Sequence, residues 1–370
     1  MMFTASKSAL LDALKLVGQI VERRNTIPVL QNVLFERLGT TGKLIAKVTD
    51  LDIEATIPFS AAVDTGFRGF TVPAHLLMDI VKKLPDGAEI RVEAADAELT
   101  GVTLKSGRSR FRLQVLPPAD FPSLDGAEMP FAIDIPGTAF EHAIGGVRFA
   151  ISTEETRYYL NGIYLHPSEG GLTLVATDGH RLSKRFIPLE GVPQDMPGVI
   201  VPKKTVEALL KHLPKNEDVT LQISDAKIRL MIGDMVLVSK LIDGTFPDYR
   251  RVIPAYTNFV EVEGKALSAA IDRVSTVSTG NGRAVKMTFY EGLLKLTVNN
   301  PDAGNAEDDL PYEGEAELEV GFNAKYVNDA LANLSEQTVN IYLGDPGSPA
   351  VLRADGDHAE NLIVLMPMRV

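Results

Sequence analysis

Internal repetition is the feature that most limits what this chain can fold into. Three segments carry apolar residues at positions i, i+3, i+4 and i+7, the pattern of an amphipathic helix. They are residues 10–17, 140–147 and 267–274. A second set with the same pattern follows in the same order, at 77–84, 206–213 and 327–334. Corresponding helices lie between 121 and 130 residues apart, so the sequence predicts one domain repeated three times.

The segments between these helices predict strands. "GKLIAKVTDLDIEATIPF", "GLTLVATDGHRLSKRFIPL" and "GLLKLTVNN" are rich in β-branched residues, partly alternate and contain tight turns. Each copy therefore reads as helix, strands, helix, strands, and the expected class is α+β. Proline-bearing stretches at 116–130 and 241–254 join the copies, so we expect three domains, at residues 1–124, 125–252 and 253–370.

The C-terminal stretch "NLIVLMPMRV" is apolar where a free terminus is normally polar. An apolar end must be buried on folding or kept for a ligand. The third copy ends where the earlier copies run into their linkers, so we expect its last segment to begin as a core strand. Pro367 lacks the N–H that a strand ladder needs, and it marks the change to a surface extension.

Composition narrows the class of protein. The net charge of −12 argues against a wholly basic nucleic-acid binder, although it says nothing of a positive surface enclosed within an acidic assembly. The chain has no cysteine, hence no disulfide or thiolate site. It shows no signal peptide and no stretch of about 20 apolar residues, so we expect a soluble, cytoplasmic protein.

The segment "ATDGHRLSK" allows two interpretations. Asp178 and His180 could form a general base and its orienting carboxylate, as in a hydrolase, but no nucleophile is identifiable. Thr49-Asp50 occupies the same place in the first copy without a histidine, which favours a hairpin turn. The sequence has no P-loop, dinucleotide glycine pattern or HExxH, and its six histidines are widely spaced. We therefore expect no catalytic residue, cofactor or metal.

The segment "ETRYYLNG" places Arg157 beside Tyr158 and Tyr159. In a strand, adjacent tyrosines would face opposite sides, one in the core and one exposed. An exposed aromatic ring beside arginine suits peptide or nucleic-acid contact. Basic residues also recur near the predicted helices, and in three repeated domains they could line one surface, although ordinary solvated helix faces explain them equally well.

Several motifs resemble one family. "RYYLNGIYL", "ATDGHRLS", "FPDYRRVIP", "NNP" and "MPMRV" are similar, in order and across the whole chain, to the bacterial DNA polymerase III beta subunits, the replicative sliding clamps. The resemblance implies a head-to-tail homodimer of three-domain crescents, with helices lining a hole for duplex DNA and antiparallel sheets outside. Such a ring has no active site. It tethers the replicative polymerase and so confers processivity.

The resemblance also implies particular residues. The positions that match DNA contacts are Arg24, Tyr158, Tyr159, Lys203 and Lys204. The positions that match an apolar peptide-binding cleft are Leu160, Thr177, Gly179, His180, Arg181, Leu182, Pro247, Arg251, Val252, Asn323, Tyr326, Val364, Met366, Pro367, Met368 and Arg369. The positions that match the dimer interface are Arg108, Arg110, Phe111, Leu113, Thr276, Val277, Asp302, Glu307 and Asp308.

The implied partners are a second copy, double-stranded DNA without sequence specificity, and proteins that carry short linear motifs. These proteins include the polymerase catalytic subunit, an ATP-driven clamp loader and other replication or repair proteins. No membrane is involved. A protein-only scaffold with the same repeat, but without DNA, is the alternative.

Overall fold

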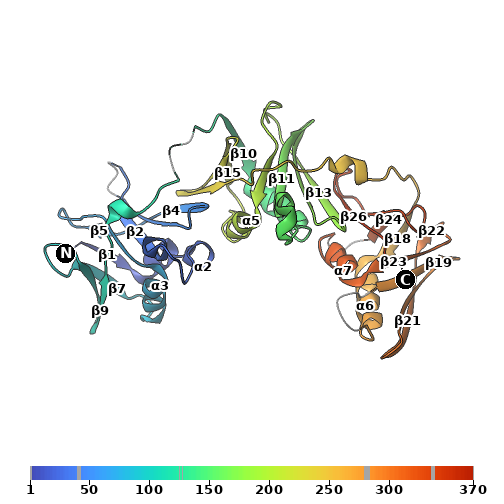
Figure 1. Cartoon of the computed structure of the whole chain (residues 1–370), viewed down its shortest axis with the longest axis horizontal. Helices are drawn as coiled ribbons and strands as arrows, with labels where there is room; N and C mark the ends of the chain where they lie inside the picture. Colours follow the sequence, from blue (N-terminus) through green and yellow to red (C-terminus); the bar gives the residue numbers. More distant parts are fainter. Residues whose placement is uncertain are drawn as a thin grey trace. The chain divides into compact units, whose positions relative to one another are not determined.

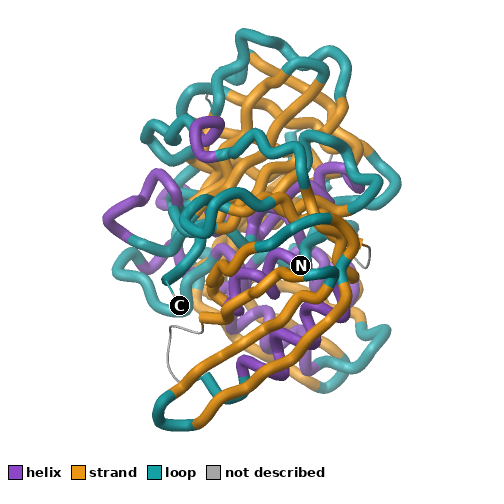
Figure 2. The backbone as a smooth tube through the Cα atoms, turned by 90° about the vertical axis from the view of Figure 1, so that its right-hand side faces the viewer, coloured by secondary structure: helices purple, strands orange, loops and turns teal. Residues whose placement is uncertain are grey.

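The computed structural model describes residues 2–39, 43–124, 126, 128–278, 284–334 and 338–369, in which strands predominate over helices (Figure 2). The first copy contains two helical regions among its strands. Its elements are β1 (Phe3–Ser6), α1 (Lys7–Ala13), α2 (Val17–Ile20), β2 (Asn32–Arg37), β3 (Leu44–Thr49), β4 (Ile53–Phe59), β5 (Ala62–Val63), β6 (Phe70–Pro73), α3 (Ala74–Lys83), β7 (Glu89–Ala94), β8 (Gly101–Ser106) and β9 (Ser109–Gln114). The first helical region consists of two short helices, α1 and α2.

The other two copies repeat this order. The second has β10 (Phe131–Pro136), α4 (Gly137–Arg148), β11 (Gly162–Ser168), β12 (Gly171–Thr177), β13 (Arg181–Pro188), β14 (Val199–Pro202), α5 (Lys203–Leu210), β15 (Asp218–Ile223), β16 (Lys227–Ile232) and β17 (Met235–Lys240). The third has β18 (Phe259–Glu263), α6 (Gly264–Ser275), β19 (Ala284–Tyr290), β20 (Leu293–Asn300), β21 (Gly304–Pro311), β22 (Glu313–Gly314), β23 (Leu318–Asn323), α7 (Ala324–Ala332), β24 (Thr338–Tyr342), β25 (Ala350–Ala354) and β26 (Leu362–Leu365). The predicted threefold repeat and α+β class are confirmed.

The start of each copy and the extent of the first helix differ from the prediction. A strand precedes the first helix of every copy, and the helix predicted over residues 10–17 breaks after Ala13. Leu14 donates its N–H to both Leu10 and Leu11, which tightens the chain into a turn. Leu14 and Leu16 are both fully buried. A continuous helix would place residues two apart on opposite sides, so the break lets both side chains enter the core.

Each copy forms two antiparallel ladders, and the ladders of successive copies join. The four sheets have the orders β5-β1-β7-β8-β9, β10-β15-β16-β17-β4-β3-β2-β6, β14-β11-β12-β13-β26-β25-β24-β18-β22 and β21-β20-β19-β23. The joining pairs are β4 with β17 and β13 with β26. Among the described strands, β9 and β21 stand at sheet edges.

The chain divides into two compact units. One contains residues 1–138 and 204–241, and the other contains residues 139–203 and 242–370. The second copy contributes to both units: most of α4 and all of β11–β14 belong to one, and β15–β17 belong to the other (β15 is yellow in Figure 1). Each joining strand pair therefore lies inside a single unit. In the third copy, the apolar faces of α6 and α7 enter one core through Leu267, Ile271, Val327 and Leu331.

Candidate functional site

A tight turn joins β12 to β13. The Thr177 hydroxyl accepts the Gly179 N–H at 3.1 Å. Asp178 Oδ1 accepts the N–H groups of His180 and Arg181 at 2.9 and 3.0 Å. A short polar side chain that bonds the backbone two and three residues ahead is typical of such turns. The predicted hairpin turn is confirmed.

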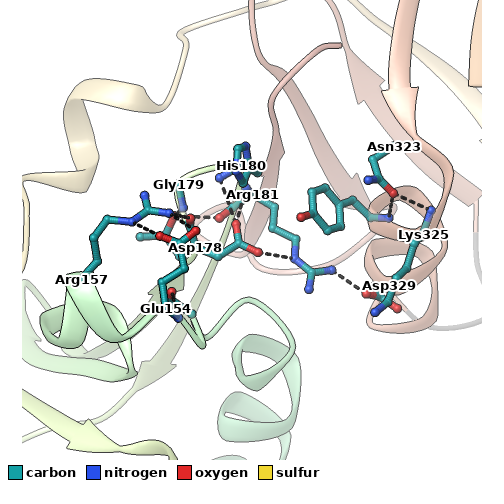
Figure 3. Close-up of polar contacts among 12 residues, drawn as sticks. Glu154, Arg157, Asp178, Gly179, His180, Arg181, Asn323, Lys325 and Asp329 are labelled. Atoms are coloured by element: carbon teal, nitrogen blue, oxygen red, sulfur yellow. Dashed lines mark hydrogen bonds and ion pairs between the residues drawn. The ribbon is translucent and has the colours of Figure 1, made fainter. Parts of the chain in front are cut away.

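Arg157 lies beside this turn, and its guanidinium points toward it (Figure 3). Its guanidinium donates to the Asp178 carbonyl at 3.0 Å and to the Glu154 carboxylate at 2.9 Å. Hydrogen bonding to Arg157 lowers the pKa of the Glu154 carboxyl. Gly179 has a φ of +88°, and a Cβ there would lie 2.5 Å from the Arg157 guanidinium. The positive φ favours glycine at this position.

Among the described contacts, both carboxylate oxygens of Asp178 serve the turn and Arg181, not the His180 ring. Oδ2 accepts the Arg181 Nε–H at 3.1 Å, while the His180 ring stacks on Tyr326 with centroids 6.2 Å apart. A hydrolase would need the carboxylate to orient the imidazole. The geometry therefore gives that interpretation no support.

Arg181 connects the turn to the third copy. Its Nη1 donates to Asp329 of α7 at 2.5 Å, and its guanidinium lies 4.4 Å from the Tyr326 ring centroid and 5.2 Å from that of Phe149. Two carboxylates and two aromatic faces thus surround a side chain that is only 9% exposed. Asn323 accepts the N–H groups of Lys325 and Tyr326, so it caps α7.

The C-terminal segment lies beside this turn. β26 pairs with β13, with Leu182 opposite Val364, and the Met366 N–H donates to the His180 carbonyl at 2.9 Å. All four residues of β26 are buried. The Met368 N–H bonds the Gly321 carbonyl beyond Pro367. The predicted core strand is confirmed. Arg369 is exposed, and Val370 lies outside the described residues.

The linker after β17 approaches the same region. Its short 3₁₀ helix η4 (Tyr249–Val252) carries Arg251 and Val252, both exposed, and Pro247 precedes it. A buried apolar cluster contains residues from the second copy, the linker and the tail: Leu160, Val175, Leu182, Ile200, Phe246, Tyr249, Val351, Leu362 and Val364. Val252 is 48% exposed and Met366 is 40% exposed. Of the residues expected in a cleft, this cluster brings together Leu160, Leu182 and Val364, which are buried.

The residues expected to contact DNA have different surroundings. Tyr158 and Tyr159 lie in a 3₁₀ helix, η3 (Glu155–Leu160), and not in a strand as predicted. The carbonyl of Glu154 accepts the Arg157 N–H, which turns the chain before the two tyrosines. Tyr158 is 54% exposed and Tyr159 is half-buried.

The basic candidates also differ from one another. Arg24 is exposed and Lys203 is half-buried. The Lys204 ammonium bonds the Asp50 carboxylate and the Ile20 carbonyl. Its charge is therefore already compensated within the protein.

The residues expected at a dimer interface lie at two sheet edges. Arg110, Phe111 and Leu113 belong to edge strand β9, and Arg108 belongs to the turn before it. Leu113 is buried in its own domain. Glu307 and Asp308 belong to edge strand β21, Asp302 to the turn before it, and Thr276 and Val277 follow α6. Hydrogen bonding to Arg273 lowers the pKa of Asp308.

Sequence reasoning missed several residues that shape the site. Asp329 holds Arg181 from 148 positions away, and Arg185 reaches Asp357 from 172 positions away. His166 bonds Tyr249 of the linker. No local pattern marks such partners. An arginine in the middle of the buried strand "LSKRFI" was the one signal available, because an arginine is almost never fully buried unless it is paired.

Three like domains joined through their sheets, with a tail strand that completes the last joint, define a three-domain clamp fold. Family models of the DNA polymerase III beta subunit match nearly the whole chain: the N-terminal domain at residues 1–125, the central domain at 134–248 and the C-terminal domain at 250–369. The chain therefore belongs to the DNA polymerase III beta subunit family, the bacterial beta sliding clamps.

Individual relatives agree over their full length. The chain is 42% identical to the beta sliding clamp of Caulobacter vibrioides and 36% identical to that of Escherichia coli, with complete coverage of both chains in each case. Among solved structures it matches a sliding clamp from Bartonella birtlesii bound to griselimycin, with a TM-score of 0.93, 44% identity and full coverage of both chains. A C. crescentus clamp with polyethylene glycol at a putative beta-motif tethering region gives a TM-score of 0.92 at 40% identity, again with full coverage.

The described residues lack two further features. None of the helices in those ranges is long and apolar enough to cross a membrane. The described side chains form no group of three or more histidine, aspartate or glutamate residues placed to hold a metal ion.

Proposed function

We propose that two copies of this chain close head to tail into a ring around duplex DNA. The observation that carries the proposal is the repeated joint between copies. In both joints, the third strand after a copy's first helical region pairs with the last strand after the next copy's second helix: β4 with β17, and β13 with β26. The third strand after the first helix of the third copy is β21, and the last strand after the second helix of the first copy is β9. Both are edge strands. Pairing β21 with β9 of a second copy would repeat the joint at both ends and close the assembly.

Charge supports this pairing. Arg108 and Arg110 are exposed at the β9 edge, while Asp302 and Glu307 are exposed at the β21 edge. Opposite charges at two meeting edges favour one orientation and speed association. We expect Arg110→Glu to convert the dimer to a monomer in sedimentation velocity experiments. Arg91→Glu is the matched control, because Arg91 is 52% exposed on β7, away from the edge. A dimer in both variants would contradict the assignment.

The ring would stay on DNA because it encircles the duplex, and not because it binds it tightly. Arg24, Tyr158, Tyr159 and Lys203 would make weak contacts that ignore sequence and permit sliding, with Lys204 restrained by Asp50. Tethering makes rebinding of the polymerase effectively intramolecular, which raises processivity. In the cytoplasm, an ATP-driven loader would open the ring onto DNA.

Retention on circular DNA tests this role. The labelled protein is loaded onto a nicked circle by the clamp loader, washed in high salt, and the circle is then cut. Release only after cutting supports encirclement. Release in the salt wash indicates ordinary electrostatic attachment, and no binding at all favours the protein-only scaffold.

We further propose that the region around His180 binds short apolar segments of the polymerase catalytic subunit, the clamp loader and other replication or repair proteins. The turn, the linker and the tail meet there over one buried apolar cluster. Met366 and Met368 suit varied ligands because their side chains are flexible and polarisable. The Bartonella clamp bound to griselimycin shows that a relative accepts a ligand, so griselimycin is a second probe for this chain.

The peptide test uses a fluorescent peptide from the clamp-binding segment of the same organism's polymerase catalytic subunit. We expect His180→Ala to raise its Kd about tenfold, the loss typical of an important interface residue. His142→Ala is the control, since His142 is exposed on α4. An unchanged Kd for His180→Ala would contradict the site. Cleavage of the peptide that disappears in this variant would instead favour the hydrolase.

A further inference from the structure

The linker that carries Pro247, Arg251 and Val252 has little backbone anchorage. The Ile242 N–H donates to the Ile200 carbonyl at 3.0 Å. The backbone hydrogen bonds described for residues 243–258 form only within this segment, for example from the Arg251 N–H to the Asp248 carbonyl. Side chains must therefore decide where this segment lies.

Two linker side chains, Phe246 and Tyr249, are buried against β11. The Phe246 ring stacks on Tyr164, with centroids 4.8 Å apart and planes within 5°. Tyr164 also lies 4.9 Å from the His166 ring. Tyr164 and His166 are two residues apart on one strand, so they project from the same face. β11 thus presents a pair of rings on which the linker rests.

A hydrogen-bond relay completes this anchor. His166 Nδ1 lies 2.7 Å from the Pro167 carbonyl oxygen, and Nε2 lies 3.0 Å from the Tyr249 hydroxyl. A carbonyl only accepts, so Nδ1 carries the proton and the Nε2 of the neutral ring accepts from Tyr249. The relay therefore runs from the hydroxyl of η4 through the imidazole to the backbone of β11.

The surroundings keep both groups neutral near pH 7. Burial raises the pKa of Tyr249 to about 12. Burial lowers the pKa of His166; the bond to the Pro167 carbonyl opposes this effect, and the positive charges of Lys184 and Arg250 add to it, so the pKa stays below its usual value. The relay thus has one protonation arrangement near pH 7.

We propose that Tyr249 and His166 are positioning residues of the peptide cleft, which set the place of η4 and, through it, of Arg251 and Val252. Tyr249 is the first residue of η4, so its hydroxyl holds the same helical turn that carries the two exposed side chains. This inference rests on the proposed function. It adds two residues, neither of which would touch the peptide.

The test is the Kd of the labelled polymerase peptide for Tyr249→Phe, which keeps the ring and removes the hydroxyl. Loss of one buried hydrogen bond predicts a rise of about three- to tenfold. The matched control is Tyr290→Phe, at an exposed tyrosine of β19. Equal affinity for Tyr249→Phe and the unsubstituted protein would overturn the inference.

One double and one triple variant separate positioning from general destabilisation. His166→Phe should also weaken binding, and His166→Phe with Tyr249→Phe should be no weaker than His166→Phe, because both remove the same bond. In an Arg251→Ala, Val252→Ala background, Tyr249→Phe should have no further effect. Losses that multiply in either case would overturn the inference. If the unsubstituted protein fails to bind the peptide, the proposed function itself is wrong.

Discussion

The turns at residues 49–53 and 177–181 occupy the same place in consecutive copies and share one hydrogen-bond scheme. In each, the threonine hydroxyl accepts the N–H two residues ahead at 3.1 Å. Asp50 Oδ1 accepts the N–H groups of Asp52 and Ile53 at 2.9 and 2.7 Å, as Asp178 does in the second copy. The third residue of each turn has positive φ, but it is Leu51 in one and Gly179 in the other.

The two turns differ in what surrounds them. The second carboxylate oxygen of Asp50 bonds Lys204 of the next copy, whereas that of Asp178 bonds Arg181. The first turn is therefore used to anchor a lysine, and the second leaves His180 exposed beside the tail. The two turns thus share one backbone conformation, and the side chains around each turn give it a different role.

The strands that follow these turns differ in the same way. Ile57 of β4 and Arg185 of β13 hold the same position after their turns, and they are 4% and 2% exposed. Arg185 donates to Asp357 at 3.0 Å and to the Asn333 carbonyl at 2.6 Å. Gly146 makes room for it, since a Cβ there would lie 2.4 Å from its Nε. One joint therefore has an apolar residue where the other has a buried ion pair.

The largest effect is expected for Arg185→Met. It removes the ion pair to Asp357, whose side chain is 25% exposed, and the bond to the Asn333 carbonyl, so the free energy of unfolding should fall by about 3–5 kcal/mol. Urea denaturation followed by circular dichroism measures this. Ile57→Met at the equivalent position should cost less than about 1.5 kcal/mol, because it conserves volume and polarity. Similar losses for the two variants would contradict the distinction between the joints.

Asp178→Ala and Asp50→Ala should be nearly equal in stability but different in function. Each removes the acceptor for two backbone N–H groups, which costs about 1–3 kcal/mol. Thermal unfolding measures that loss. Peptide affinity should fall only for Asp178→Ala, because only that turn carries His180. Equal affinity for both variants would argue against a role for the second turn.

Substitutions of the third turn residue should change stability by a smaller amount, and in opposite directions in the two turns. Gly179→Ala places a Cβ in the left-handed region against Arg157, and stability should fall by about 1–2 kcal/mol. Leu51→Gly relieves the same strain, partly offset by the entropy of glycine, and should stabilise by less than about 1 kcal/mol. Urea midpoints of the two variants test this. A destabilised Leu51→Gly protein would mean that the Leu51 side chain packs more than its backbone is strained.

The smallest effect is expected for Lys240→Ala at the first joint. Lys240 and Asp52 lie 3.1 Å apart, but their side chains are 50% and 74% exposed. Exposed pairs are screened by water and salt, so the loss should be under about 1 kcal/mol. Raising the salt concentration should remove the difference from the unsubstituted protein. A larger loss that persists in high salt would show that this joint depends on its ion pairs as well.

The sequence alone determined the features that depend on neighbours in the chain. Apolar periodicity predicted the helices that became α3, α4 and α6, alternation predicted the paired strands, and the repeated aspartate predicted the turn. The tail was predicted as a core strand for the same reason. These patterns arise from local geometry, since helix and strand periods place particular residues on one face. The predicted domain limits and the roles of individual site residues stay predictions.

Tertiary packing decided the rest. The first helix breaks because Leu14 and Leu16 must both be buried, and the tyrosines lie in a 3₁₀ helix and not in a strand. The partners of Arg181 and Arg185, and the relay from Tyr249 to His166, join residues far apart in the chain. A buried charge or hydroxyl must find a partner wherever the fold supplies one. The sequence shows which groups need partners, and only the folded chain shows which partners they have.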